Sequence, residues 1–154
     1  MLSRIKLFAA LSLLCCALLI SSTGQLSAQV PAAPAQSAST LTVRVTGIRN
    51  TNGKIRLSLY RDSKFVEGRE VEIDAKTLSA NTVFANLPQG FYAVNLFHDE
   101  NMNGKMDTNL FGMPVEGYGF SNNPHKRMGK PGFDETNFQV NQLEAAIEIK
   151  MIYW

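Results

Sequence analysis

The chain has 154 residues, with 15 Lys and Arg against 13 Asp and Glu, which is the length of one domain with almost no net charge. This balance gives no support to a nucleic-acid partner, which would require a basic surface. Both cysteines, Cys15 and Cys16, lie in the first 20 residues, so the rest of the chain can form no disulfide and has no thiol nucleophile or cysteine metal ligand.

The first 28 residues are typical of a secretory signal peptide. Arg4 and Lys6 precede an uncharged apolar run of 14 residues, 7–20, and small polar residues follow up to Ala28. The run is shorter than the ~20 residues that a membrane-spanning helix needs. We therefore predict a signal-peptide helix over 1–28, export to the periplasm or the medium, and a mature chain without a membrane span.

Residues 29–40, "QVPAAPAQSAST", contain Ala, Pro, Ser and Gln and no charged residue. Such a composition cannot bury a core, so this segment is predicted to be a flexible linker. The folded domain is then expected over residues 41–154.

From Leu41 onward, apolar and polar residues alternate with the period of a half-buried β-strand. The residues predicted to face the core are Leu41, Val43 and Val45; Ile55, Leu57 and Leu59; Val71 and Ile73; Val83, Ala85 and Leu87; Tyr92, Val94 and Leu96; and Ala145, Ile147, Ile149, Met151 and Tyr153. Asn52-Gly53 is interpreted as a tight hairpin turn between the first two strands. About seven short strands without a long amphipathic helix predict an all-β fold, an antiparallel β-sandwich.

The stretch "VFANLPQGFYAVNLFHD", residues 83–99, is similar to the hairpin of transthyretin-like, or prealbumin-type, sandwiches. In both, a strand enters a Leu-Pro-x-Gly turn and the next strand begins with a buried aromatic residue. The resemblance implies a fold and carries no information about chemistry.

The next stretch, "HDENMNGKMDTN", has the spacing of a calcium loop of the EF-hand type. Counting from its first aspartate, oxygen donors occupy positions one, three, five, seven and nine: Asp99, Asn101, Asn103, the Lys105 carbonyl and Asp107. Gly104 occupies position six, where the loop turns sharply. The flanking element is a strand, and position twelve is Leu110 in place of the usual Glu. We therefore predict a weak extracellular-type Ca²⁺ site, with an affinity on the order of 0.1–1 mM, that takes its last ligand from Glu116. The alternative is a metal-free turn, since Asn and Asp also cap their own backbone.

Residues 110–134 form a long segment with five glycines, three prolines and no clean period, which is typical of a functional loop. Its aromatic residues either anchor the loop inward or form a stacking surface for an envelope glycan or a protein ligand: Phe111, Tyr118, Phe120 and Phe133. Its basic residues, Lys126, Arg127 and Lys130, are interpreted as a solvated patch that could touch an anionic polymer.

An enzymatic function has little support, because no nucleophile–base arrangement is visible in the sequence. The alternative function is an envelope polysaccharide hydrolase that uses Asp99 and Asp107 as its two carboxylates. His98 and His125 stand alone, which disfavours zinc. His98 is interpreted as a surface or half-buried residue that could pair with Asp99.

The long motif "HDENMNGKMDTNLFGMPVEGYGFSNN", with "LPQGFYAV" upstream, resembles the signature of a secreted bacterial family catalogued as domain-of-unknown-function family 2141. The resemblance extends over about residues 41–153. It implies export and a small β domain, and it implies no established activity. The signature contains all the residues named above as side-chain ligands of the calcium loop.

Overall fold

The computed structural model describes residues 38–125 and 129–154. These residues form eight strands and one short helix: β1 (Ser39–Thr46), β2 (Lys54–Arg61), β3 (Lys64–Val71), β4 (Ala80–Leu87), β5 (Gly90–Asp99), β6 (Tyr118–Phe120), α1 (Phe133–Thr136), β7 (Phe138–Val140) and β8 (Glu144–Lys150). The predicted all-β sandwich is confirmed. The signal peptide and most of the linker lie outside the described residues, although β1 already begins at Ser39. Within the described part, no helix has the length and apolar character to cross a membrane.

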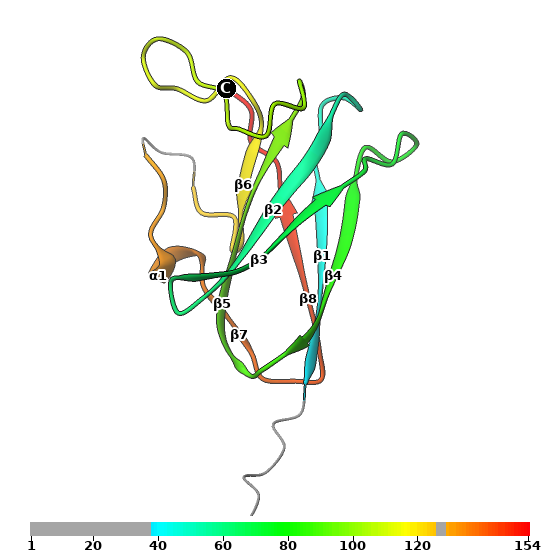
Figure 1. The fold of residues 1–154 in the computed structure, drawn as a ribbon, viewed down its shortest axis with the longest axis vertical. Coiled ribbons are helices and arrows are strands. Elements are labelled where there is room, and N and C mark those ends of the chain that lie inside the picture. The colour runs from blue at the N-terminus through cyan, green and yellow to red at the C-terminus, as the bar shows by residue number, and fades with distance from the viewer. Residues whose placement is uncertain (1–37, 126–128) are drawn as a thin grey trace, which may run out of the picture. The chain divides into compact units, whose positions relative to one another are not determined.

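The strands form two sheets, one with the order β4-β1-β8 and one with the order β3-β2-β5-β6, in which β7 also pairs with β5 (Figure 1). Neighbouring strands are antiparallel except β1 and β8, which run parallel. The predicted antiparallel sandwich is thus confirmed for the other strand pairs, and β1–β8 is the one departure from it among the described strands. The chain returns to β1 only after passing through the other sheet, and this long crossover permits a parallel alignment.

Two connections that the sequence suggested were hairpins cross between the sheets. β1 and β2 belong to different sheets, so Asn52-Gly53 is not a hairpin turn, although Gly53 has the positive φ of 64° that such a turn requires. β4 and β5 are likewise in different sheets, and the transthyretin-like hairpin is not confirmed. The hairpin that does form joins β2 to β3 through Asp62 and Ser63, whose φ values of 49° and 64° match a type I′ turn.

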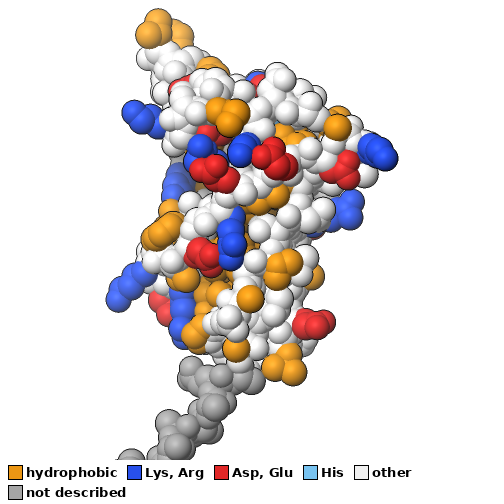
Figure 2. Space-filling view, turned by 45° about the vertical axis from the view of Figure 1, so that its right-hand side comes forward, with side chains coloured by type: hydrophobic (Ala, Val, Ile, Leu, Met, Phe, Trp, Pro, Cys, Tyr) orange, Lys and Arg blue, Asp and Glu red, His pale blue; other side chains and the backbone are white. Residues whose placement is uncertain are grey.

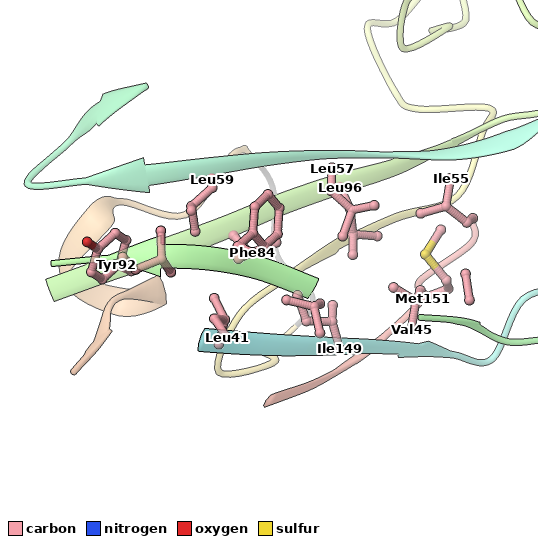
Figure 3. Close-up of a cluster of buried hydrophobic side chains, with 14 of the residues drawn as sticks. Leu41, Val45, Ile55, Leu57, Leu59, Phe84, Tyr92, Leu96, Ile149 and Met151 are labelled. Carbon is pink, nitrogen blue, oxygen red and sulfur yellow. The ribbon is translucent and has the colours of Figure 1, made fainter. Parts of the chain in front are cut away.

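The core lies between the two sheets (Figure 3). One side contains Leu41, Val43, Val45, Phe84 and Ile149, and the other contains Ile55, Leu57, Leu59, Tyr92, Val94 and Leu96, all of them buried. The alternation predicted for β1, β2, β5 and β8 is thus confirmed, because alternate residues of each strand point into the core. On β5 the opposite face is partly covered as well, since Ala93 and Asp99 are buried there.

Strand β4 departs from the predicted alternation. Phe84 is fully buried, whereas Val83 and Ala85 are exposed, so the expectation for these two residues was wrong. Asn86 has a φ of 58°, and the register with β1 shifts between the pairs Leu41–Phe84 and Ser39–Leu87. A β-bulge at this point adds one residue and returns Leu87 to the core face, as predicted.

The predicted irregular loop 110–134 contains strand β6 and the start of helix α1. β6 pairs with β5 at Asn95–Phe97, and β7 pairs with β5 at Gly90–Tyr92, so the two short strands share one edge of β5. Between them, the Ser121 hydroxyl accepts a hydrogen bond from Val94 N at 2.9 Å and lies 2.5 Å from the Thr136 carbonyl oxygen. This side chain joins the two halves of the edge where no strand is present.

Candidate functional site

The polar loop begins at the last residue of β5. Asp99 has no exposed surface, although it extends from the outer face of the sheet. Its carboxylate accepts hydrogen bonds from Asn103 N at 3.0 Å, Gly104 N at 2.9 Å and Arg56 Nε at 2.5 Å. Burial opposes ionisation of this group, but the Arg56 guanidinium and the two amides outweigh burial and lower the pKa of Asp99. The loop is therefore built around an ionised, buried carboxylate.

Three further side chains of the predicted ligand set meet on the solvent side of this loop. The amide groups of Asn101 and Asn103 donate hydrogen bonds to the Asp107 carboxylate at 2.6 Å and 3.0 Å. Asn103 N also lies 3.0 Å from the side-chain oxygens of both Asp99 and Asn101. The spacing thus brings Asp99, Asn101, Asn103 and Asp107 together, as the calcium-loop prediction requires. At position seven, Lys105 N donates to the Asn103 side-chain oxygen at 2.8 Å.

Glu116 is also brought to the loop, but its oxygens are used differently. Its side chain is almost completely buried. One oxygen accepts a hydrogen bond from Glu100 N at 3.0 Å and the other from Asp107 N at 3.1 Å. Glu116 therefore fastens the beginning of the loop to its end through main-chain amides.

Carboxylates and histidines alone do not make a metal centre here. In residues 38–125 and 129–154, no three His, Cys, Asp or Glu side chains group closely enough to hold a metal ion. A cation at this loop would depend on asparagine oxygens and main-chain carbonyls, which are the ligands of a hard ion such as Ca²⁺.

His98 lies on the opposite face of β5 from Asp99, and the expectation of a surface or half-buried histidine was wrong. It is fully buried, with Nε2 2.6 Å from the Asn52 carbonyl oxygen and Nδ1 2.9 Å from the Tyr153 hydroxyl. A carbonyl oxygen can only accept, so Nε2 carries a proton, and in the neutral tautomer that this requires Nδ1 would accept from Tyr153. The Tyr153 hydroxyl also accepts from Arg49 N at 3.3 Å. This group has a structural role in joining the C-terminal segment to the end of β5.

A groove of about 340 Å³ lies beside the loop. Its walls are largely aromatic and apolar, with contributions from Phe111, Met113, Pro114, Tyr118, Phe120 and Trp154. Phe111 is 90% exposed and Trp154 is 52% exposed. Figure 2 shows hydrophobic side chains at the tip of the segment that projects at the top left of the view. The sequence pointed to the first five positions only through their place in an irregular loop, and it gave no signal for Trp154.

The comparison with protein families decides the relationship of the chain. The model of the family described as "uncharacterized protein conserved in bacteria (DUF2141)" matches residues 43–148. The chain belongs to this family. Comparisons with curated proteins and with solved structures found no match.

Much of the motif by which the chain resembles other DUF2141 domains has a structural explanation. A Cβ atom on Gly117 would lie 2.2 Å from the Tyr153 ring, and one on Gly119 would lie 2.8 Å from Ile149. Both positions therefore need glycine for close packing of residues 117–119 against β8 and the residues after it.

The asparagines of the same motif bind neighbouring backbone. Asn122 Nδ2 donates to the Asn137 carbonyl at 2.6 Å. Asn123 donates to the Glu148 carbonyl at 2.9 Å and accepts from Lys150 N at 2.7 Å, which places it along the edge of β8. These contacts hold the segment after β6 against both sheets.

Proposed function

We propose that this DUF2141 domain is an exported, non-catalytic binding module whose loop 99–107 binds Ca²⁺. The observation that carries the proposal is the meeting of the Asn101, Asn103 and Asp107 side chains. The main-chain N–H of Asn103 also donates to the side-chain oxygens of both Asp99 and Asn101. An asparagine amide carries a nitrogen donor on one side and an oxygen acceptor on the other. Rotation of the two amides would turn their oxygens toward Asp107, an arrangement that a cation stabilises.

The proposed ligands are the side chains of Asp99, Asn101, Asn103 and Asp107, with the Lys105 carbonyl. Glu116 would support this set from behind by holding both ends of the loop. Arg56 pairs with Asp99 as well as with Glu70, so Asp107 is the one carboxylate of the set without an ion-pair partner among the described residues. A site with so little net charge should bind weakly, with a dissociation constant on the order of 0.1–1 mM.

The burial of Asp99 supports a non-catalytic function over the hydrolase. A glycosidase needs two carboxyl groups that both reach the sugar. Asp99 has no exposed surface and its oxygens are bonded to Arg56 and two amides. A sugar, which is far larger than a metal ion, could reach it only if the loop opened.

A metal-free structural loop is the second candidate, and a specific observation favours it. The asparagine nitrogens, rather than their oxygens, face Asp107, so these amides take the place of a cation. The two candidates predict opposite effects of Asn103→Asp. Without an ion the variant loses a donor and adds repulsion, whereas a calcium site gains a ligand charge.

The test is thermal unfolding of the mature domain in calcium chloride and in a chelator. At a calcium concentration ten times the dissociation constant, the stabilisation should be roughly 1.4 kcal/mol. This should raise the Tm by about 5 °C for a domain of this size. Asp107→Ala should abolish the shift, and Asp134→Ala, which removes an exposed aspartate of α1, should preserve it.

Equal melting temperatures in calcium and chelator, together with no heat in a calcium titration, would reject the ion. A Tm increase in Asn103→Asp that requires calcium would reject the metal-free candidate. The export component has its own test, since N-terminal sequencing of the protein from the periplasm or medium should begin at Gln29.

A further inference from the structure

The outer face of the five-stranded sheet has two neighbouring hollows. The first is the 340 Å³ groove beside Tyr118 and Phe120 of β6. The second, of about 220 Å³, includes Tyr60 of β2 and Asn95 of β5. Asn95 is the cross-strand partner of Phe120, so the two hollows belong to adjoining strands of one surface. Lys130 contributes to the walls of both.

The two hollows differ in chemistry. The first is mainly aromatic, and the indole nitrogen of Trp154 donates to the Tyr118 hydroxyl at 2.8 Å, which fixes the two rings relative to each other. The second includes Ser63, Asn95 and Tyr60, whose side chains carry hydrogen-bonding groups. A ligand that spans both must therefore present apolar faces and polar edges together.

The charge of the residues around the two hollows narrows the class of ligand further. Lys130 is the one charged residue among the described residues that form the two hollows, and no acidic side chain contributes to either. Its ammonium group lies 5.5 Å from the centre of the Tyr60 ring, between the aromatic and the polar parts. An anionic group on the ligand would be attracted to this position, and a cationic group would be repelled.

The edge of the surface disfavours an extended peptide. Peptides commonly bind sheets by pairing with a free strand edge. Tyr118 of β6 already exchanges main-chain hydrogen bonds with Ile152, at 2.9 Å and 2.8 Å. Recognition beside β6 must therefore come from side chains.

We infer that this surface binds an acidic glycan, with pyranose rings stacked on the aromatic groove and a uronic-acid carboxylate at Lys130. Each sugar unit presents an apolar C–H face to an aromatic ring and hydroxyl groups to polar side chains, which is the combination that the two hollows offer. The inference rests on the proposed function as a binding module and names its class of ligand.

The test uses the single tryptophan of the chain. Because Trp154 forms part of the groove, its fluorescence reports occupancy directly. The probe is tetragalacturonic acid, titrated in chelator and again in calcium chloride. Maltotetraose, an uncharged sugar of the same length, and tetraglutamate, an anionic peptide of similar charge, serve as comparison ligands. Tetragalacturonic acid should change the fluorescence saturably and bind at least about tenfold more tightly than either comparison ligand, a ratio that corresponds to one decade of affinity.

Two exposed residues provide variants that should not disturb folding. Lys130→Gln and Phe111→Ala should each weaken binding about tenfold, which is the scale of one lost charged or aromatic contact. Lys76→Gln and Phe91→Ala, which alter an exposed lysine and an exposed aromatic outside both hollows, should leave binding unchanged. Melting curves of all four variants should match that of the unaltered domain, which checks that the fold is retained.

The absence of a saturable change with tetragalacturonic acid in both media would overturn the inference. If maltotetraose bound equally well, Lys130 would not recognise a carboxylate. If tetraglutamate bound equally well, the surface would not be specific for a sugar. A calcium-dependent Tm without glycan binding would reject this inference and leave the ion site intact. Glycan binding without a calcium effect on Tm would reject the ion site and leave the glycan inference intact.

Discussion

Gly53 lies directly against the backbone of Asp99, and a Cβ atom on Gly53 would stand 1.8 Å from the Asp99 carbonyl oxygen. Gly53 also has a φ of 64°, which side chains rarely adopt. The connection from β1 to β2 thus passes the start of the polar loop at a distance that only glycine permits.

Gly53→Ala should therefore destabilise the domain severely, by at least about 4 kcal/mol, because a backbone atom must move to relieve the clash. Gly104→Ala is the matched control. Gly104 has a similar φ of 79°, but a Cβ atom there would meet only the Arg56 side chain at 3.9 Å. Its cost should be the backbone strain alone, about 1–2 kcal/mol. Urea denaturation measures both, and equal losses would show that the contact with Asp99 has no effect.

The Asp99 carboxylate should make stability depend on pH in the acid range. Its pKa in the folded state is lower than the ordinary value of 3.8, so the ionised form contributes stability above that value. This contribution is lost as the pH falls through the folded pKa. Asp99→Ala should lower the free energy of unfolding by about 3 kcal/mol at neutral pH, since it removes the partner of Arg56 and of two amides.

Urea denaturation between about pH 2 and pH 7 measures the effect, and the slope with pH should flatten in Asp99→Ala. Glu148→Ala is the control, because Glu148 forms an exposed ion pair with Arg44 at 3.7 Å. Its loss should be within about 0.5 kcal/mol. An unchanged acid slope in Asp99→Ala would mean that other carboxyl groups control acid unfolding.

The Tyr153 hydroxyl should contribute more to the free energy of unfolding than an exposed hydroxyl does. Tyr153→Phe leaves His98 Nδ1 without its hydrogen-bond partner in a fully buried position, which should cost about 1–3 kcal/mol. Tyr118→Phe removes a hydroxyl that accepts from Trp154 near the surface and should cost less than about 1 kcal/mol. Nitrogen NMR of His98 should find the proton on Nε2. Protonation on Nδ1 in the neutral ring would contradict the assigned bonding.

Asn123 should protect the edge of β8 as well as stabilise it. Asn123→Ala removes two hydrogen bonds to the β8 backbone and should cost about 1 kcal/mol. The freed main-chain groups of Glu148 and Lys150 would then be open to pairing with another chain. Light scattering at high concentration should detect association of Asn123→Ala and not of Asn81→Ala, an exposed asparagine on β4.

The alternation of apolar residues was a reliable guide wherever a strand kept its period. It failed at Val83 and Ala85 because the positive φ of Asn86 adds a residue that the pattern does not reveal. It also gave no information about which strands pair. Asn52-Gly53 has the local geometry of a turn, but packing between distant segments determines which strands pair with β1 and with β2.

The candidate site was predictable to the extent that it is local. Asp99, Asn101, Asn103 and Asp107 lie within nine residues, so their spacing specified their meeting. Glu116 was placed near the loop correctly, but its bonds to main-chain amides could not be read from residue types. The contributions of Tyr153 and Trp154 depend on the return of the C-terminus to the loop, which no sequence pattern indicated.

The parallel pairing of β1 with β8 has a consequence for the order in which the chain can fold. Val43 in the middle strand of its sheet pairs with Ile147, 104 positions further along. This sheet cannot be completed until nearly the whole chain has left the ribosome, and contacts of such long range form slowly. A nascent chain would therefore spend its synthesis with one edge of β1 unfilled, a state that is compatible with the export proposed above, because an exported chain passes a translocation channel before it folds.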